Sequence, residues 1–419
     1  MRTNKIWARL LVVEGCIVED VALLEGEGGE QLVVRGRLRP DERGRCSVCR
    51  RRCPGYDAGV GRRRWRCLDL GTLKAFVEAE APRVTCPAHG VVVAAVPWAR
   101  RASLFTRAFE DTLAWLAART DKTTVSTSMR ISWRTVGSII ERVVAEQRKQ
   151  RSPFQGVTRI GVDEVSYRRG HRYLTVVVDH DSGRLLFAHQ GRGEAAIDAF
   201  FDALGEDGCA GLQLVTADAS PIYNAVIRRR CKNASVVMDP FHVVKWATDA
   251  LDKVRRQVWN DARKNGLDAD AIKGTRYALL KNPGNLNDKQ KNTLDVVEKT
   301  NLPLFRAYLL KEHLREVFVL KGHAGATLLK TWLEWTQHED IKPFRDVAKS
   351  ILNNADAIGA ALRLGLSNAR VEALNTRMQL LTRVAFGFHS AKALIALAML
   401  KLGGYCPALP CRTTHSPVS

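Results

Sequence analysis

The spacing of hydrophobic residues changes several times along the chain and predicts several domains. Residues 1–40 hold two short apolar stretches, Ile6–Val13 and Gln31–Leu38, around a turn at 25–30 that is rich in glycine and glutamate. Alternation of apolar and polar residues is typical of strands, so we expect both stretches to be strands. Together with the cysteine-containing region that follows, they predict an N-terminal domain over residues 1–98.

Between residues 99 and 152 the apolar residues recur at helical spacing. Ser132 can cap a helix in this region. We expect that helix to bury four apolar residues, Trp133, Val136, Ile140 and Val143. A short segment at 121–129 precedes this longer, basic helix, an order typical of a helix-turn-helix. Three small helices could also form a plain connector, but the positive charge of the chain favours DNA binding.

A mixed pattern of strands and helices begins at residue 157. The expected strands are Val157–Ser166, Arg172–Asp179, Arg184–Gln190, Leu212–Asp218 and Ala234–Met238. The expected helices are Glu194–Leu204, one opened by Ser220 and Pro221, and one from about His242 to Lys264. The order β-β-β-α-β-α-β-α is typical of the ribonuclease-H-like fold. We therefore expect a mixed β-sheet flanked by helices, with its first part over residues 153–265.

Residues 266–360 show only helical spacing, which predicts an all-helical insertion into this α/β domain. One apolar stripe in it consists of Phe305, Leu309, Leu310, Leu314, Val317 and Phe318. Amphipathic helices return over residues 361–405, which we assign to the ribonuclease-H-like domain. A tail with three prolines, 406–419, ends the chain.

The charge of the chain indicates the class of its partner. Of 419 residues, 65 are Lys or Arg and 44 are Asp or Glu, so the net charge is +21. Such an excess favours nucleic acid as the partner. A solubilising surface is the alternative, but such surfaces usually mix charges of both signs. We expect DNA contacts from an arginine-rich segment at 45–66 and from the helix-turn-helix, namely Arg50, Arg51, Arg52, Arg62, Arg63, Arg64, Arg130 and Arg134.

Composition also excludes two classes of protein. Hydrophobic residues make up 46% of the chain, which is enough for a core and excludes a mainly disordered protein. No apolar run approaches the ~18 residues that a membrane span requires, and no signal-peptide hydrophobic segment follows Met1. We therefore expect a cytoplasmic protein with no membrane partner.

Two pairs of metal-binding residues stand in the N-terminal domain, Cys46-x2-Cys49 and Cys86-x2-His89. A gap of two residues lets both side chains of a pair face one ion, and a tetrahedral zinc ion takes two such pairs. The residues between the pairs can form the hairpin of a zinc ribbon. Cys53 and Cys67 leave the ligand set open, since either could replace His89. Free thiols are the alternative to structural zinc.

Two aspartates lie on neighbouring strands of the expected sheet. Asp163 lies within the first strand, and Asp218 ends the fourth. A carboxylate in a buried strand is costly unless it binds a metal ion or a partner, and the carboxyl ends of strands are where α/β sheets place their sites. Taken singly, Asp163 could be an edge residue and Asp218 a turn or cap residue. As a pair on adjacent strands, they favour a shared cation.

A third acidic residue could come from the helix that follows Ser367. Glu372, Asn375 and Gln379 share one polar face of this helix. The opposite apolar stripe consists of Val371, Leu374, Met378 and Leu381. Because every helix of a soluble protein has a polar face, periodicity alone gives Glu372 no role.

Several sequence blocks resemble those of bacterial insertion-sequence transposases of the ISL-three family. The blocks are Gly161-Val-Asp-Glu, Thr216-Ala-Asp-Ala-Ser, Met238-Asp-Pro-Phe-His-Val, and Ser367-Asn followed by Val371-Glu-Ala-Leu-Asn, Arg383 and Gly387-Phe. The cysteine pairs, the Pro97-Trp-Ala-Arg segment and the helix-turn-helix are also similar, so the resemblance covers nearly the whole chain. The family's second cysteine pair is represented here by Cys86 and His89.

The resemblance implies a DNA transposase with an Asp-Asp-Glu triad, which maps onto Asp163, Asp218 and Glu372. Two Mg²⁺ or Mn²⁺ ions would be held by these carboxylates, and structural Zn²⁺ by the N-terminal pairs. The family's Asp-x-x-His element maps onto Asp239 and His242, which could support the active site or simply cap a helix. Asn375 and Arg383 are further candidates for support. Glu164 and Asp179 are spare acidic residues, to which we assign no catalytic role.

The expected partners are double-stranded DNA, as terminal inverted repeats and target, and a second copy of the chain, because two transposon ends must be brought together. Two other functions remain open. One is a domesticated regulator that binds DNA without cutting it. The other is a ribonuclease-H-like nuclease that cuts branched DNA regardless of sequence.

Overall fold

The chain forms two compact units. The computed structural model describes residues 2–26, 29–168, 170–217, 221–266, 269–364, 369–385, 388 and 390–410. Unit 1 combines the first 152 residues with the segment that begins at Ala396, and unit 2 runs from Pro153 to Ile395. The segment from Ala396 to 405, which we assigned to the ribonuclease-H-like domain, therefore groups with unit 1. Within the described residues, no helix is both long and apolar enough to cross a lipid bilayer.

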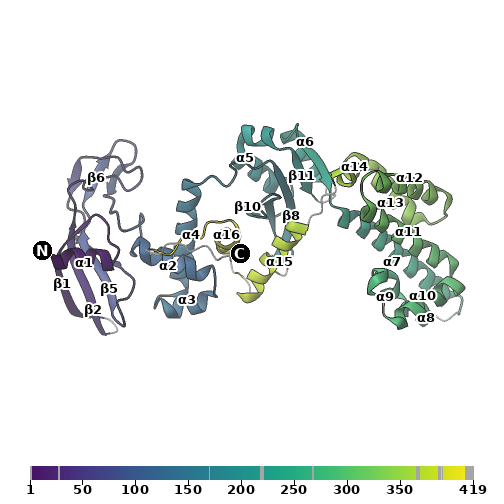
Figure 1. Ribbon diagram of the computed structural model, residues 1–419, viewed down its shortest axis with the longest axis horizontal. Coiled ribbons are helices and arrows are strands. Elements are labelled where there is room, and N and C mark those ends of the chain that lie inside the picture. The colour runs from purple at the N-terminus through teal and green to yellow at the C-terminus, as the bar shows by residue number, and fades with distance from the viewer. Residues whose placement is uncertain are drawn as a thin grey trace. The chain divides into compact units, whose positions relative to one another are not determined.

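Unit 1 begins with a helix on a four-stranded sheet of order β1-β2-β5-β4 (Figure 1). The elements are α1 (Arg2–Leu10), β1 (Cys16–Gly26), β2 (Gly29–Leu38), β4 (Arg62–Arg66) and β5 (Lys74–Glu80). The strand expected over Ile6–Val13 is wrong. Trp7 and Leu11 both pack into the core of this sheet. Their spacing of four suits a helix, and so short an apolar run cannot separate helix from strand by periodicity.

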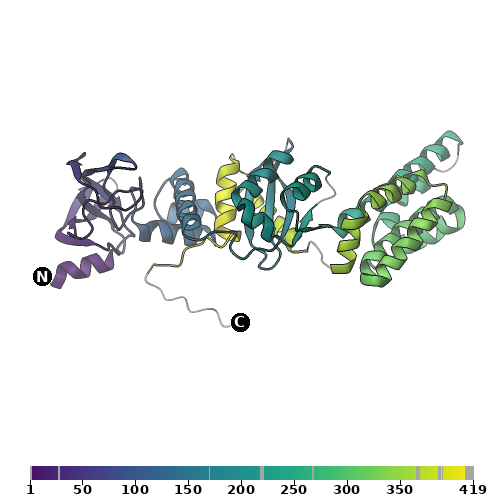
Figure 2. The same cartoon turned by 90° about the horizontal axis from the view of Figure 1, so that it is seen from above.

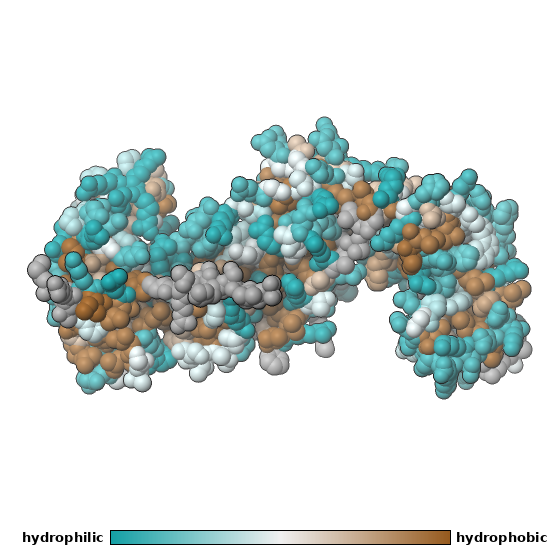
Figure 3. All heavy atoms as spheres, in the orientation of Figure 1, coloured by the Kyte–Doolittle hydropathy of each residue, from teal (hydrophilic) through white to brown (hydrophobic). Residues whose placement is uncertain are grey.

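A smaller, three-stranded sheet carries the metal-binding pairs. It consists of β3 (Gly55–Asp57), β6 (Arg83–Cys86) and β7 (Gly90–Val93) in the order β3-β6-β7. Its buried cluster contains only Cys46, Cys53, Val84, Cys86 and Ala94. Figure 3 shows a mostly hydrophilic surface over this part of unit 1. A core of this size stabilises a fold weakly, so small modules of this kind usually depend on a metal ion.

The helix-turn-helix consists of α2 (Arg107–Ala117), α3 (Lys122–Ser128) and α4 (Trp133–Gln150). A side-chain oxygen caps each helix: Thr106 accepts from the amide of Phe109, Asp121 from that of Thr123, and Ser132 from that of Thr135. The predicted cap at Ser132 is thus confirmed.

One residue of the predicted α4 core lies elsewhere. Val136, Ile140 and Val143 are buried as expected, but Trp133 is 46% exposed. Trp133 occupies the first position of the helix, and its ring stacks against Lys122, whose Nζ lies 3.4 Å from the ring centroid. A cation–π contact therefore replaces the expected burial.

Unit 2 contains a five-stranded sheet of order β10-β9-β8-β11-β12. Its strands are β8 (Arg159–Arg168), β9 (Arg172–Asp179), β10 (Leu185–Gln190), β11 (Leu214–Ala217) and β12 (Ser235–Met238). The pairs β8–β9 and β9–β10 are antiparallel, whereas β11 runs parallel to both β8 and β12. Three antiparallel strands followed by two parallel ones confirm the predicted ribonuclease-H-like fold.

Two helices cover one face of this sheet, α5 (Glu194–Gly211) and α6 (Pro221–Arg230) (Figure 2). Ile160 and Val162 of β8 face them, in a cluster with Phe200 of α5 and Val226 of α6. Because successive side chains of a strand point to opposite faces, Gly161 and Asp163 face the other side of the sheet.

The segment after β12 is helical throughout its described residues, which confirms the all-helical insertion. It contains α7 (Pro240–Lys264), α8 (Ala269–Gly274), α9 (Arg276–Leu280), a 3-10 turn (Pro283–Asn285), α10 (Asp288–Thr300), α11 (Leu302–Leu320), α12 (Gly322–His338), α13 (Lys342–Asn353) and α14 (Ala355–Leu364). Leu310, Leu314 and Val317 of the predicted stripe are fully buried. Ala360 and Ala361 of α14 pack on Leu214 and Val237, so the insertion ends against the sheet.

The chain then returns to the first strand of the sheet through α15 (Ala369–Val384), before α16 (Ala391–Leu402). Figure 1 shows α15 beside β8. A methyl group on Gly161 would overlap Cγ2 of Val371 and lie 3.0 Å from Oγ1 of Thr216. The absence of a side chain at Gly161 therefore allows α15 to approach the backbone of β8 closely.

This contact predicts a specific pair of stability effects. Replacing Gly161 with alanine should destabilise unit 2 by about 1–3 kcal/mol, since the methyl group must displace α15. Adding Val371→Ala should recover part of that loss, because it removes the overlapping methyl group. Denaturant unfolding of the single and double variants measures both effects. Strictly additive losses would show that α15 does not lie on Gly161.

Candidate functional site

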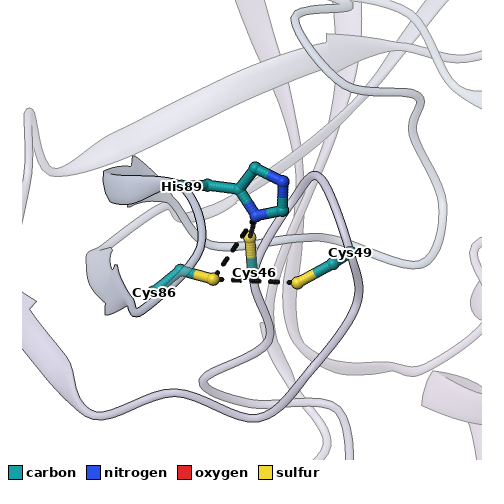
Figure 4. Close-up of side chains that lie close together, drawn as sticks. All are labelled: Cys46, Cys49, Cys86 and His89. Atoms are coloured by element: carbon teal, nitrogen blue, oxygen red, sulfur yellow. Dashed lines mark hydrogen bonds between the residues drawn. The ribbon is translucent and has the colours of Figure 1, made fainter.

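The two metal-binding pairs of unit 1 come together at one point. Cys46 and Cys49 lie in the loop before β3, Cys86 ends β6, and His89 lies in the turn to β7. The four ligand atoms, three Sγ and one imidazole nitrogen, all lie within 4.8 Å of one another (Figure 4). Sequence spacing had paired these residues, and the fold brings both pairs together.

The distances within this cluster fit a tetrahedral zinc ion. Zn–S bonds of about 2.3 Å and Zn–N bonds of about 2.0 Å imply edges of about 3.8 Å between two sulfurs and about 3.5 Å between sulfur and nitrogen. Sγ of Cys49 lies 3.7 Å from Sγ of Cys86. Nδ1 of His89 lies 3.4 Å from Sγ of Cys86 and 3.7 Å from Sγ of Cys46.

The electrostatics of the cluster also suit a cation. Burial alone would raise the pKa of Cys86, but hydrogen bonds from the backbone of Ala88 and from Cys46 and Cys49 lower it to about 7. A thiol of this kind loses its proton readily, and the thiolate is the form that binds zinc.

The two spare cysteines have other surroundings. Cys67 is fully buried in the core of the four-stranded sheet, where desolvation raises its pKa to about 12. Cys53 borders the cluster, but its thiol donates to the carbonyl of Arg51 at 3.4 Å. Neither belongs to the group of four converging ligand atoms.

A buried charge network holds the helix-turn-helix together. The guanidinium of Arg100, only 5% exposed, contacts Glu110 at 3.1 Å and Asp111 at 2.7 Å on α2, and Glu146 at 2.6 Å on α4. Burial would lower the pKa of Arg100, yet these carboxylates raise it. Arg142 of α4 also pairs with Glu110, at 2.8 Å. Sequence reasoning gave Arg100 no role, because its partners are distant in the sequence.

The arginines expected to contact DNA fall into two groups. Arg64 pairs with Glu78 at 2.8 Å, Arg62 with Glu19 at 3.7 Å, and Arg130 with Asp69. The others are Arg50, Arg51, Arg52, Arg63 and Arg134, and no ion pair is found for them in the described part of the chain. Arg134 lies exposed in the first turn of α4.

In unit 2, a helical side chain reaches the carboxylate of Asp163. Nδ2 of Asn375 on α15 donates a hydrogen bond to Oδ2 of Asp163, whose Oδ1 accepts from the amide of Glu164 at 2.6 Å. Glu372 lies one helical turn before Asn375, and residues three apart are neighbours on a helix surface. Glu372 is exposed, whereas Val371, Leu374 and Met378 are buried, as the sequence predicted. The structure thus brings Asn375 of α15 to Asp163, 212 residues away in the chain.

Asp218 lies outside the described residues. It directly follows Ala217, the last residue of β11, and β11 pairs with β8 in parallel, with Thr216 opposite Gly161. The hydroxyl of Thr216 forms a hydrogen bond with Nε2 of His180, at a distance of 2.7 Å.

The remaining candidates lie at helix ends. Asp239 follows β12 and caps α7 by accepting from the amide of Phe241 at 3.0 Å, while its other oxygen lies 3.4 Å from Nδ1 of His242. Arg383 is exposed in the last turn of α15, where a positive charge stabilises the helix. Within the Asp-x-x-His element, Asp239 rather than His242 therefore caps the helix.

A further hydrogen bond lies on the opposite face of β8. The hydroxyl of Tyr223, in the first turn of α6, donates to Oε1 of Glu164 at 2.6 Å. Sequence reasoning missed this pair, because an acidic residue beside Asp163 carries no signal of a tyrosine partner on another element.

The surroundings of Asp163 fit a hydrated cation with oxygen ligands. Asp163 is half-buried, and its neighbour Asn375 has a buried Oδ1 for which the described residues offer no hydrogen-bond donor. A buried amide oxygen without a donor is costly, and a metal ion or its water satisfies it.

Three models of known protein families match the zinc-binding, helix-turn-helix and ribonuclease-H-like regions of the chain. A family model described as "Transposase" matches residues 160–398, one described as a helix-turn-helix domain of transposase family ISL3 matches 94–144, and one described as a zinc-finger of transposases IS204/IS1001/IS1096/IS1165 matches 42–89.

Individual transposases match over most or all of the chain. The transposase for insertion sequence element IS1557 from two strains of Mycobacterium tuberculosis, CDC 1551 / Oshkosh and ATCC 25618 / H37Rv, is 47% identical over 100% of both chains. The transposase for element IS1001 of Bordetella parapertussis is 26% identical over 82% of this chain and 85% of its own. The three family models match this chain in the order zinc finger, helix-turn-helix and transposase domain, and the chain belongs to the ISL3 (ISL-three) family of insertion-sequence transposases.

Proposed function

We propose that the protein binds the terminal inverted repeats of an insertion sequence and catalyses metal-dependent DNA strand cleavage and strand transfer. The active site would consist of Asp163, Asp218 and Glu372. The observation that carries this proposal is the hydrogen bond between Asn375 and Asp163, because it places α15, with Glu372 one turn away, at the strand that bears the first aspartate.

The three carboxylates would act as oxygen ligands. Asp163 projects from β8, Asp218 follows the adjacent strand β11, and Glu372 belongs to the helix that packs across β8. When bound, two Mg²⁺ ions would activate water or a DNA 3′-hydroxyl and stabilise the departing 3′-oxygen. Asn375 would hold the Asp163 carboxylate in one orientation, and its Oδ1 would remain for a water molecule or ion. No side-chain nucleophile is required.

Unit 1 would recognise the transposon end. Residues at the N-terminus of the second helix of a helix-turn-helix contact base edges in the major groove, and Arg134 lies at this position of α4. Zinc, held by Cys46, Cys49, Cys86 and His89, would fix the smaller sheet. Two ends must be joined, so we propose that the protein acts as a homodimer.

Amide substitutions test the triad. Asp163→Asn, Asp218→Asn and Glu372→Gln keep the size of the side chain but remove its charge, so each should lower cleavage by about 100-fold or more while leaving DNA binding unchanged. Cleavage of a labelled terminal duplex in Mg²⁺, beside a gel-shift assay, measures both. Glu164→Gln is the matched control, because a glutamine oxygen still accepts from Tyr223.

The same assay separates the proposal from its rivals. A regulator would bind the terminal duplex without cutting it, and a structure-specific nuclease would cut branched DNA of any sequence. Full cleavage by Glu372→Gln would remove this residue from the triad.

The zinc site predicts one zinc ion per chain by elemental analysis. Cys49→Ser should lose this zinc, whereas Cys67→Ser should retain it, because Cys67 lies in a different core. Chelation should make the arginine-rich segment at 45–66 sensitive to trypsin, since a structural zinc ion contributes directly to folding. Retention of full zinc by Cys49→Ser would contradict the assignment.

Arg134 predicts a sequence-specific effect. Arg134→Ala should weaken binding to the terminal repeat about tenfold and hardly affect binding to a scrambled duplex of equal length. A base contact is made only with the correct sequence, so its loss lowers the affinity for that sequence alone. Fluorescence anisotropy with both duplexes measures this. Equal losses on both would instead make Arg134 a phosphate contact.

A further inference from the structure

A cleft in unit 1 brings together arginines from three separate segments. It has a volume of about 260 Å³ and lies between the zinc-binding module, strand β4 and the segment before α2. Arg50 comes from the loop after Cys49, Arg63 from β4, and Arg101 from the segment that precedes the helix-turn-helix. We call it the arginine cleft. Trp65 and residues 92–96 also line it.

Successive side chains of β4 point to opposite faces of the strand, so its arginines have different neighbours. Arg62 and Arg64 lie on one face of the strand, where Glu78 lies 2.8 Å from Arg64 and 4.0 Å from Arg62. Arg63 lies between them in the sequence and shares the opposite face with Trp65, which is buried. Within the described residues, no acidic side chain forms an ion pair with Arg50, Arg63 or Arg101.

The cleft therefore carries guanidinium groups that have no acidic partner at ion-pair distance within the described residues. Arg100 also lines it, but its charge is matched by Glu110, Asp111 and Glu146. Partial burial is the main cause that lowers the pKa of Arg50, and repulsion from Arg107 adds to it, against the attraction of Glu146 and Glu42. An anion in the cleft would relieve this repulsion.

We propose that the arginine cleft binds a backbone phosphate of the DNA duplex that the helix-turn-helix holds. This inference rests on the proposed function, because it requires DNA on unit 1. Guanidinium groups form paired hydrogen bonds with phosphate oxygens, and such contacts fix the position of a protein on DNA without reading sequence. Because Arg101 belongs to the segment that enters α2, a phosphate here would set the zinc-binding module in register with the helix-turn-helix.

Neighbouring arginines on β4 offer a matched test. Arg63→Ala and Arg64→Ala remove the same charge from adjacent positions of one strand. Arg63→Ala should weaken binding to terminal and scrambled duplexes alike, about tenfold near 0.15 M salt, and flatten the slope of log K against log salt by about 0.9. Arg64→Ala should change affinity less than about twofold, since Arg64 is paired with Glu78. Arg101→Ala should resemble Arg63→Ala. Zinc content and melting temperature confirm that each variant is folded.

The outcomes separate this inference from the proposed function. If Arg63→Ala and Arg64→Ala lower affinity equally, only the overall charge matters and the arginine cleft is not a site. If Arg134→Ala still loses sequence preference in that case, DNA recognition by the helix-turn-helix stands. Wild-type protein that binds no terminal duplex would overturn both. Inorganic phosphate, added at constant ionic strength, should compete no better than chloride. Displacement of duplex by phosphate from wild type but not from Arg63→Ala would assign the cleft to a free anion instead.

Discussion

The close packing of α15 on β8 is the contact on which the proposed active site depends. Gly161 leaves room for Val371, and two residues further along the strand Asp163 accepts a hydrogen bond from Asn375. The strand and the helix are separated by an all-helical insertion. The last helix of the insertion, α14, packs on Leu214 of β11 and Val237 of β12, so the insertion ends against the same sheet that carries Asp163.

Unit 1 uses arginine in two physically different ways. Arg100 is buried and contacts three carboxylates, so it links α2 to α4, and removing its guanidinium would leave the buried Glu110 without one of its cationic partners, which is costly. Arg63 and Arg101 have no acidic partner in the described structure and border a cleft. The same side chain can therefore be structural or available to a ligand, depending on whether an acidic residue lies across from it.

Local patterns predicted most of the fold, and they failed where a tertiary contact outweighed them. The succession of strands and helices along unit 2, the caps of the helix-turn-helix and the helical insertion could be predicted from periodicity and capping residues. These signals act over a few positions of the chain. Trp133 fits the apolar stripe of α4 but stacks on Lys122 instead. Residues 6–13 alternate weakly like a strand, yet Trp7 lies in helix α1, and Trp7 and Leu11, four residues apart, both pack against the core of the sheet. In both places the conformation depends on a contact with residues outside the local segment, namely Lys122 for Trp133 and the core of the sheet for Trp7 and Leu11.

The family, the order of the domains and the residue types available for chemistry could be predicted from the sequence, because motifs and their spacing are properties of the chain. It paired Cys46 with Cys49 and Cys86 with His89, but left Cys53 and Cys67 as rivals. Three features required the folded chain: which four ligand atoms converge, that Asn375 reaches Asp163, and which arginines of β4 have acidic partners. These are distances between residues far apart in the chain, and they are fixed by how sheets and helices pack, which no local pattern encodes.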